Sequence, residues 1–142
     1  MTTRLELKAD VEELGRLADS VATFAETHGV DPLVTGRLTV ALDEVVTNAI
    51  MYGDLGAEAS IFVDLSLDGG DVVATVTDPG PAFDPLTSPP IVDTTLPLEE
   101  RPVGGLGLFI VRQLARDLAY RHVDGCNCLT MRLAPDGVAP AG

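Results

Sequence analysis

Hydrophobic and polar residues alternate in several short stretches of the chain, and this period of two predicts β-strands with one buried face. The first stretch covers residues 5–7. Two more, at 61–67 and 72–76, flank the turn sequence DGGD and predict a hairpin. The last two, at 120–124 and 128–133, flank a glycine and predict a closing hairpin.

Two longer segments repeat their apolar residues every three or four positions, as amphipathic helices do. The first runs from Asp10, a suitable N-cap with Glu13 at the capping-box position, to Gly29. The second runs from Asp31, followed by proline, to Gly53. The stripes expected to face the core are Val11, Leu14, Ala18, Val21, Ala22 and Ala25 in the first helix, and Leu38, Ala41, Leu42, Val45, Ala49 and Ile50 in the second.

A proline-rich stretch at 85–103 has no periodicity, and loops of this length are usually functional or mobile. A third helix is expected over 106–120, with a stripe of Leu106, Ile110, Leu114 and Leu118. This order of elements predicts an α+β fold, a two-layer sandwich with helices on one face of a mostly antiparallel mixed sheet. We expect a single domain over residues 1–142 with a loose tail at about 134–142.

Composition narrows the class of protein. The chain of 142 residues is 46% hydrophobic, which suffices for an ordered core. The sequence contains neither a run of about 18 apolar residues nor a signal-peptide core, so we expect a cytoplasmic protein. A formal charge of −13 disfavours nucleic-acid binding and suits a basic protein partner. Cys126 and Cys128 lie too close in sequence to close a structural loop or to hold zinc alone.

Glu44 and Asn48 lie four residues apart on the flank of the second helix. This spacing sets a carboxylate and an amide side by side at the edge of the core. Such a pair fits a binding site, and it also fits two ordinary solvent-facing residues, so the pair alone decides nothing.

Asp78 ends the second strand of the first hairpin and is followed by a proline and by Gly80. Glycine lets the backbone come close to a flat group, and the carboxylate can accept a hydrogen bond from an exocyclic amine. The same residues also fit a simple turn, so the context has to decide.

The sequence GGLGL at 104–108 leads into the third helix, where backbone N–H groups and the positive helix end can face phosphate oxygens. It is not a P-loop, which needs Gly-Lys-Ser/Thr, and it does not follow a strand as a Rossmann turn does. Glycine-rich helix starts also occur for packing alone.

The three motifs LDEVVTNAIMYGD, DPGPAFDP and VGGLGLFIVRQL occur in this order, within about residues 37–133. They resemble the N, G1 and G2 boxes of the GHKL ATPase superfamily, which includes gyrase and sensor histidine kinases. The compact length and the FDP ending resemble the bacterial anti-sigma-factor serine kinases. The resemblance implies a Bergerat ATP-binding fold that uses ATP and Mg²⁺.

The resemblance also implies a role for each matching residue. Glu44 would be the general base, and Asn48 would coordinate the Mg²⁺ that bridges the phosphates. Asp78 would accept a hydrogen bond from the adenine amino group, Gly80 would let the ring lie against the backbone, and Thr130 would assist through a water. The backbone donors to the phosphates would be Gly104, Gly105, Gly107 and Leu108.

The stretch at 85–103 would be the ATP lid, in which Arg101 either contacts a phosphate or is simply solvated. Two residues depart from the family pattern. Ala82, in the expected nucleotide-binding loop, stands where a second glycine is usual, and Tyr52 stands where a histidine often follows the N box. The alanine is a small change, whereas Tyr52 leaves the positioning of the substrate open.

The leading hypothesis is a serine kinase and anti-sigma factor that phosphorylates a STAS-type anti-anti-sigma antagonist and otherwise sequesters a sigma factor, as the resemblance implies. One alternative is a nucleotide-responsive binding module without turnover, which Glu44 disfavours because a pure binder needs no base. Another is a partner-switching kinase with a target other than a sigma factor. The expected assembly is a homodimer, without direct contact to nucleic acid or a membrane.

Overall fold

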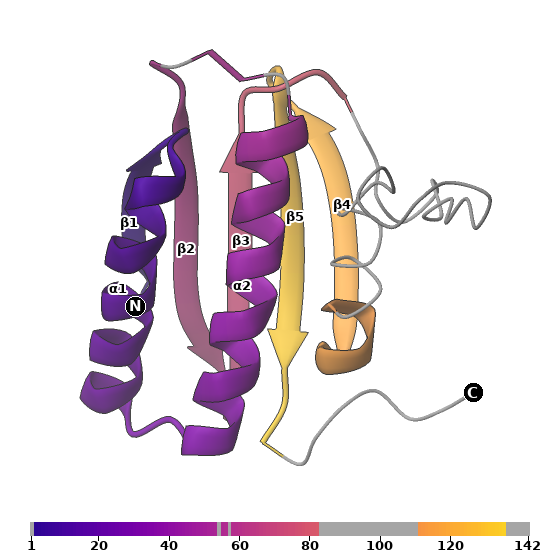
Figure 1. Cartoon of the computed structure of the whole chain (residues 1–142). Helices are drawn as coiled ribbons and strands as arrows, with labels where there is room; N and C mark the ends of the chain where they lie inside the picture. The colour runs from indigo at the N-terminus through magenta and orange to yellow at the C-terminus, as the bar shows by residue number, and fades with distance from the viewer. Residues whose placement is uncertain (1, 54, 57, 83–110, 136–142) are drawn as a thin grey trace, which may run out of the picture.

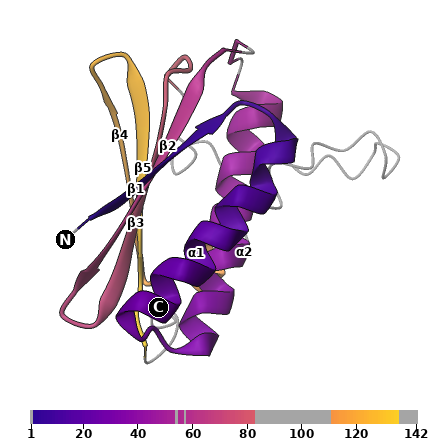
Figure 2. The same cartoon turned by 90° about the vertical axis from the view of Figure 1, so that its left-hand side faces the viewer.

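A computed structural model describes residues 2–53, 55–56, 58–82 and 111–135. Within these ranges, five strands form one sheet in the order β1-β2-β3-β5-β4, and every neighbouring pair is antiparallel. Helices α1 and α2 cover one face of this sheet (Figures 1 and 2), which confirms the expected α+β sandwich. The elements are β1 Thr3–Lys8, a 3-10 turn at Val11–Glu13, α1 Leu14–His28, α2 Pro32–Tyr52, β2 Ser60–Asp68, β3 Asp71–Asp78, β4 Asp117–Val123 and β5 Cys126–Leu133.

The expected caps are found at the helix ends, with one variation. Asp31 accepts a hydrogen bond from a backbone N–H in the first turn of α2 (2.8 Å), and Gly29 ends α1 in the left-handed conformation with φ 66°. Asp10 caps the 3-10 turn, but Glu13 does not complete a capping box with it. The Glu13 carboxylate instead accepts from the backbone N–H of Lys8 (3.0 Å) and so joins the start of α1 to the end of β1.

Helix α1 buries only part of the expected stripe: Val21 and Ala25 are buried, and Leu14 packs against the core. Its buried side chains are Leu17, Val21, Phe24 and Ala25, whereas Val11, Ala18 and Ala22 are exposed. This arrangement buries the large Leu17 and Phe24 in place of two alanines and therefore removes more apolar surface from water. On α2 the expected stripe is buried, apart from the partly buried Ile50, and Val34 and Val46 join it.

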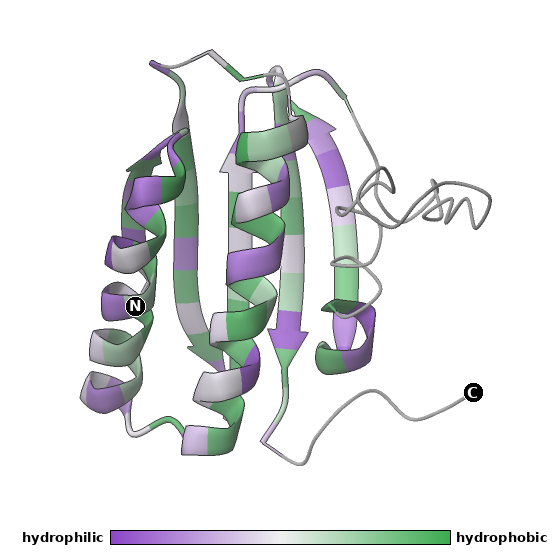
Figure 3. Ribbon diagram, in the orientation of Figure 1, coloured by the Kyte–Doolittle hydropathy of each residue, from purple (hydrophilic) through white to green (hydrophobic). Residues whose placement is uncertain are grey.

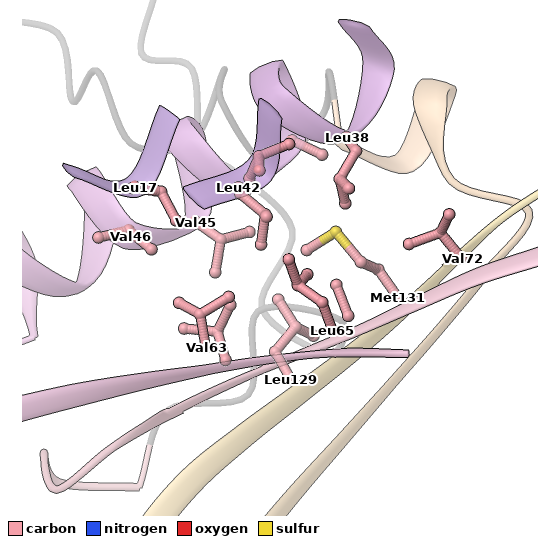
Figure 4. Packing of buried hydrophobic residues seen from close by; sticks show 14 of the residues in the cluster. Leu17, Leu38, Leu42, Val45, Val46, Val63, Leu65, Val72, Leu129 and Met131 are labelled. Carbon is pink, nitrogen blue, oxygen red and sulfur yellow. The ribbon is translucent and has the colours of Figure 1, made fainter. Parts of the chain in front are cut away.

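The core fills the space between the two helices and the inward face of the sheet. Figure 4 shows Leu38 and Leu42 of α2 on the helix side and Met131 of β5 on the sheet side of this cluster. Hydrophobic and hydrophilic residues alternate along the strands (Figure 3). The buried strand residues are Leu7, Ile61, Val63, Leu65, Val72, Ala74, Val76, Leu129, Met131 and Leu133. This alternation fixes the side of the sheet on which each candidate site residue lies.

The expected third helix ends earlier than its apolar stripe suggests. Residues 111–114 are helical, and the chain is paired with β5 from residue 116, where the N–H of Arg116 donates to the carbonyl of Arg132 (2.7 Å). Leu118, expected on the helix, therefore lies in β4 and pairs with Met131. The spacing of Leu118 from Tyr120 fits a strand, and pairing with β5 decides in favour of the strand.

Two further expectations concern the C-terminal tail and membranes. Ala134, near the expected start of the tail, is buried; residues 136–142 lie outside the described ranges, so the loose tail stays a prediction. Of the helices in the described ranges, none combines the length and the apolar character needed to cross a membrane.

Candidate functional site

The end of β3 packs directly against the end of α2. A Cβ atom on Gly80 would lie 2.6 Å from the carbonyl oxygen of Gly53 and 3.0 Å from the side chain of Leu55. Gly80 therefore packs closely against the protein's own loop after α2, and its expected role beside the adenine ring stays a prediction. This contact requires glycine at position 80 and holds Asp78 at the C-terminal end of α2.

The Asp78 side chain has a fixed orientation at this end of the sheet. Its Oδ1 atom accepts hydrogen bonds from the backbone N–H of Gly80 (2.8 Å) and from the side-chain amide of Asn127 (3.1 Å). In the part of the chain that the structure describes, no donor contacts the other oxygen, Oδ2. Asp78 is half-buried, so it offers one oriented acceptor at the edge of the core.

Thr130 does not lie on this side of the sheet. It pairs with Thr75 across the β3–β5 ladder, and the two hydroxyls lie 3.1 Å apart on the face that α1 and α2 leave uncovered. Asp78 instead pairs with Asn127, three residues before Thr130, on the face covered by the helices. The structure thus separates Thr130 from Asp78 and places Asn127 beside the carboxylate.

Asn48 and Glu44 lie one and two turns before the end of α2, and both side chains are half-buried. Their four-residue spacing places them about 6 Å apart along the helix axis. Because Gly53 at the end of α2 contacts Gly80, this flank of the helix and Asp78 belong to the same end of the molecule. Ala82 is exposed on the loop that leaves this site.

Several expected site residues lie outside the described ranges. These are Arg101, Gly104, Gly105, Gly107 and Leu108, together with the whole expected ATP lid at 85–103. Their roles stay predictions.

The donor and acceptor groups of the described residues fit a nucleotide with Mg²⁺. Asp78 offers an acceptor for an amino group, and Asn48 offers an uncharged oxygen of the kind that Mg²⁺ accepts beside phosphate and water ligands. Among the described residues there is no cluster of three or more His, Cys, Asp or Glu side chains that could hold a metal.

Helices α1 and α2 lie over one face of an antiparallel sheet in a two-layer sandwich (Figure 2), and Asp78 provides an acceptor at the end of β3. The family described as histidine kinase-like ATPase domain matches residues 7–133, and the chain belongs to this family. The expected membership of the GHKL superfamily is thereby confirmed.

Two similar proteins are named as kinases, and one similar solved structure contains RsbU and RsbW domains. The serine/threonine-protein kinase BtrW of Bordetella bronchiseptica is 32% identical over 97 residues, which are 66% of this chain and 66% of that protein. The serine-protein kinase RsbW of Listeria monocytogenes is 28% identical over 131 residues, 89% of this chain and 82% of that protein. A crystal structure of the RsbU and RsbW domains of a Mycobacterium tuberculosis protein matches 99% of this chain and 34% of its own, with a TM-score of 0.68 and 19% identity.

The chain thus spans just under two thirds of the Bordetella kinase and about a third of the Mycobacterium chain. The similarity to the Mycobacterium structure supports the fold alone.

Sequence reasoning missed Asn127 and its neighbour Tyr120. Asn127 sits between two cysteines at the start of β5, and no local motif marks it. The signal that identifies it is the pairing register between β3 and β5, which joins residues 49 positions apart. A register shift of one residue moves a side chain to the other face of a sheet, so this register could not be inferred from either strand alone.

Proposed function

We propose that the protein is an ATP-dependent serine kinase that phosphorylates a STAS-type antagonist protein and otherwise sequesters a sigma factor. The observation that carries the proposal is the contact between Gly53 and Gly80. It brings the oriented carboxylate of Asp78 to the end of the helix that carries Asn48 and Glu44. Membership of the ATPase family and the kinase names of two relatives support it.

Each described site residue has one task in this proposal. Asp78 accepts a hydrogen bond from the adenine amino group, and Asn48 holds Mg²⁺ through its amide oxygen. Glu44 would accept the proton of the substrate serine hydroxyl as that oxygen bonds to the γ-phosphorus. The bond from this phosphorus to the oxygen it shares with the β-phosphate would break at the same time and release ADP, a transfer that depends mainly on positioning and charge neutralisation. When bound, Mg-ATP supplies the γ-phosphoryl group and the neutralising positive charge.

The test is a transfer assay with Mg-ATP labelled in the γ-phosphate and a STAS-type antagonist protein. Wild type should form phosphoserine on the antagonist. Glu44→Gln should lower the rate about 10²- to 10⁴-fold, because removing a general base costs about this much, while ATP still binds. Both the rate and the ATP affinity are measured.

The matched control is Glu26→Gln, which removes an exposed carboxylate from α1 and should leave the transfer rate unchanged. If Glu44→Gln transfers phosphate at the wild-type rate, Glu44 is not the general base. If wild type binds ATP and a partner but forms no phosphoserine, the binding module without turnover replaces the kinase.

A further inference from the structure

Asn127 connects three acceptors at the end of β3. Its side-chain nitrogen lies 3.1 Å from Oδ1 of Asp78, 3.2 Å from the carbonyl oxygen of Gly80 and 2.9 Å from that of Pro81. An amide nitrogen carries two hydrogens, so these three acceptors share them. Asn127 therefore holds both the carboxylate and the backbone of the loop that follows it.

Tyr120 determines which way the Asn127 amide points. The Tyr120 hydroxyl donates a hydrogen bond to the side-chain oxygen of Asn127, and the tyrosine ring is partly buried against the core from β4. Rotating the amide by half a turn would bring its oxygen against the Asp78 carboxylate and two carbonyl oxygens. It would also turn the amide nitrogen toward the tyrosine. The hydroxyl of Tyr120 thus favours the amide orientation that donates to Asp78.

These hydrogen bonds fix the orientation of the Asp78 carboxylate. Two donors occupy Oδ1, so the carboxylate cannot turn freely, and Oδ2 remains as an oriented acceptor. An oriented acceptor at the edge of the core favours a ligand that donates a hydrogen bond and disfavours one that lacks the donor.

We propose that Asn127 and Tyr120 are positioning residues that orient Asp78 and thereby make the site selective for a purine nucleotide with an amino group on the ring. This inference rests on the proposed nucleotide site. It assigns to this chain a Tyr120–Asn127–Asp78 series of hydrogen bonds in which only Asp78 touches the ligand.

The experiment compares the binding of ATP with that of purine riboside 5′-triphosphate, which lacks the 6-amino group, by isothermal titration calorimetry. Wild type should prefer ATP by about tenfold, the value of one net buried hydrogen bond. Tyr120→Phe keeps the ring and should lower this preference to about threefold, and Asn127→Ala should bring it close to one. Affinity for the analogue should stay within about twofold.

Thr77→Val is the matched control. It removes a hydroxyl next to Asp78 without changing side-chain shape, but Thr77 contacts Cys128 on the opposite face of the sheet. The preference for ATP should stay tenfold in this variant. In an Asp78→Asn background, adding Tyr120→Phe should change the preference no further.

The outcomes separate this inference from the proposed function. Suppose that wild type prefers ATP to the analogue. If Tyr120→Phe and Asn127→Ala keep this preference, or if they lose affinity for ATP and for the analogue equally, Asn127 and Tyr120 have only a structural role and the inference is wrong. If wild type binds neither nucleotide, or both equally, the proposed site at Asp78 fails and the inference fails with it.

Discussion

At the scale of single residues, Gly80 lets the loop after β3 come into close contact with the loop after α2. The Gly53 carbonyl and the Leu55 side chain occupy the space that a side chain at position 80 would need. The same contact keeps Asp78 next to α2. Removing the close approach should therefore affect stability and site geometry together.

Gly80→Ala is expected to lower the free energy of unfolding by about 1–3 kcal/mol, because its Cβ would lie 2.6 Å from a backbone oxygen that cannot rotate away. Gly36→Ala is the matched control on α2, where an added Cβ meets no atom within 4 Å. This control should gain about 0.5–1 kcal/mol from higher helix propensity. Urea unfolding measures the stability of both variants. If Gly80→Ala has the same free energy of unfolding as wild type, the two loops are not in contact.

At the scale of elements, Glu13 joins β1 to α1. Its carboxylate accepts from the backbone N–H of Lys8 and pairs with Arg16, and these contacts, the backbone hydrogen bond first, lower the pKa of Glu13 below its ordinary value of 4.5. A carboxyl whose pKa is lower in the folded state stabilises the fold above its unfolded pKa. That contribution is lost as the pH falls through the folded pKa.

Glu13→Gln should therefore be less stable than wild type at pH 7, and the difference should shrink below about pH 4.5 and vanish once Glu13 is protonated in the folded wild type. Urea unfolding of both proteins at several pH values between 7 and 3 measures this. A difference that stays constant over the range would show that the charge of Glu13 has no part in the contact.

The helix ends could be predicted because caps are local: Asp31 and Gly29 act on backbone groups within a few residues. The end of the third helix could not, because the strand that begins at Asp117 is stabilised by β5, and apolar spacing at 114–118 fits a helix equally well. The same difference between local and long-range interactions explains which candidate site residues could be predicted. Glu44, Asn48 and Asp78 follow from motifs, whereas Asn127 follows only from pairing between distant strands.

At the scale of the whole molecule, charge is the dominant feature. The chain carries 22 acidic and 9 basic residues. The described ion pairs, such as Arg4 with Asp64 and Arg132 with Asp68 and Asp71, involve partly exposed side chains, and pairs of this kind contribute little each. Repulsion between the many unmatched carboxylates should therefore exceed the attraction in these pairs.

The free energy of unfolding should accordingly rise between about 0.02 and 0.5 M NaCl, because salt shortens the Debye length to a few ångströms and screens the repulsion. Unfolding in urea, which is uncharged, isolates this effect from that of the denaturant. A fall in stability with added salt would mean that the ion pairs outweigh the net charge.

The strand order also has a consequence for synthesis. β5 lies between β3 and β4, so β3 has no partner on that side until residues 126–133 have left the ribosome. During that interval, β1, β2 and β3 expose a row of unpaired backbone groups to neighbouring nascent chains. The sheet therefore cannot be completed until the whole segment from β3 to β5 has been made, and before then the partly made chain exposes a strand edge that chaperones could protect from aggregation.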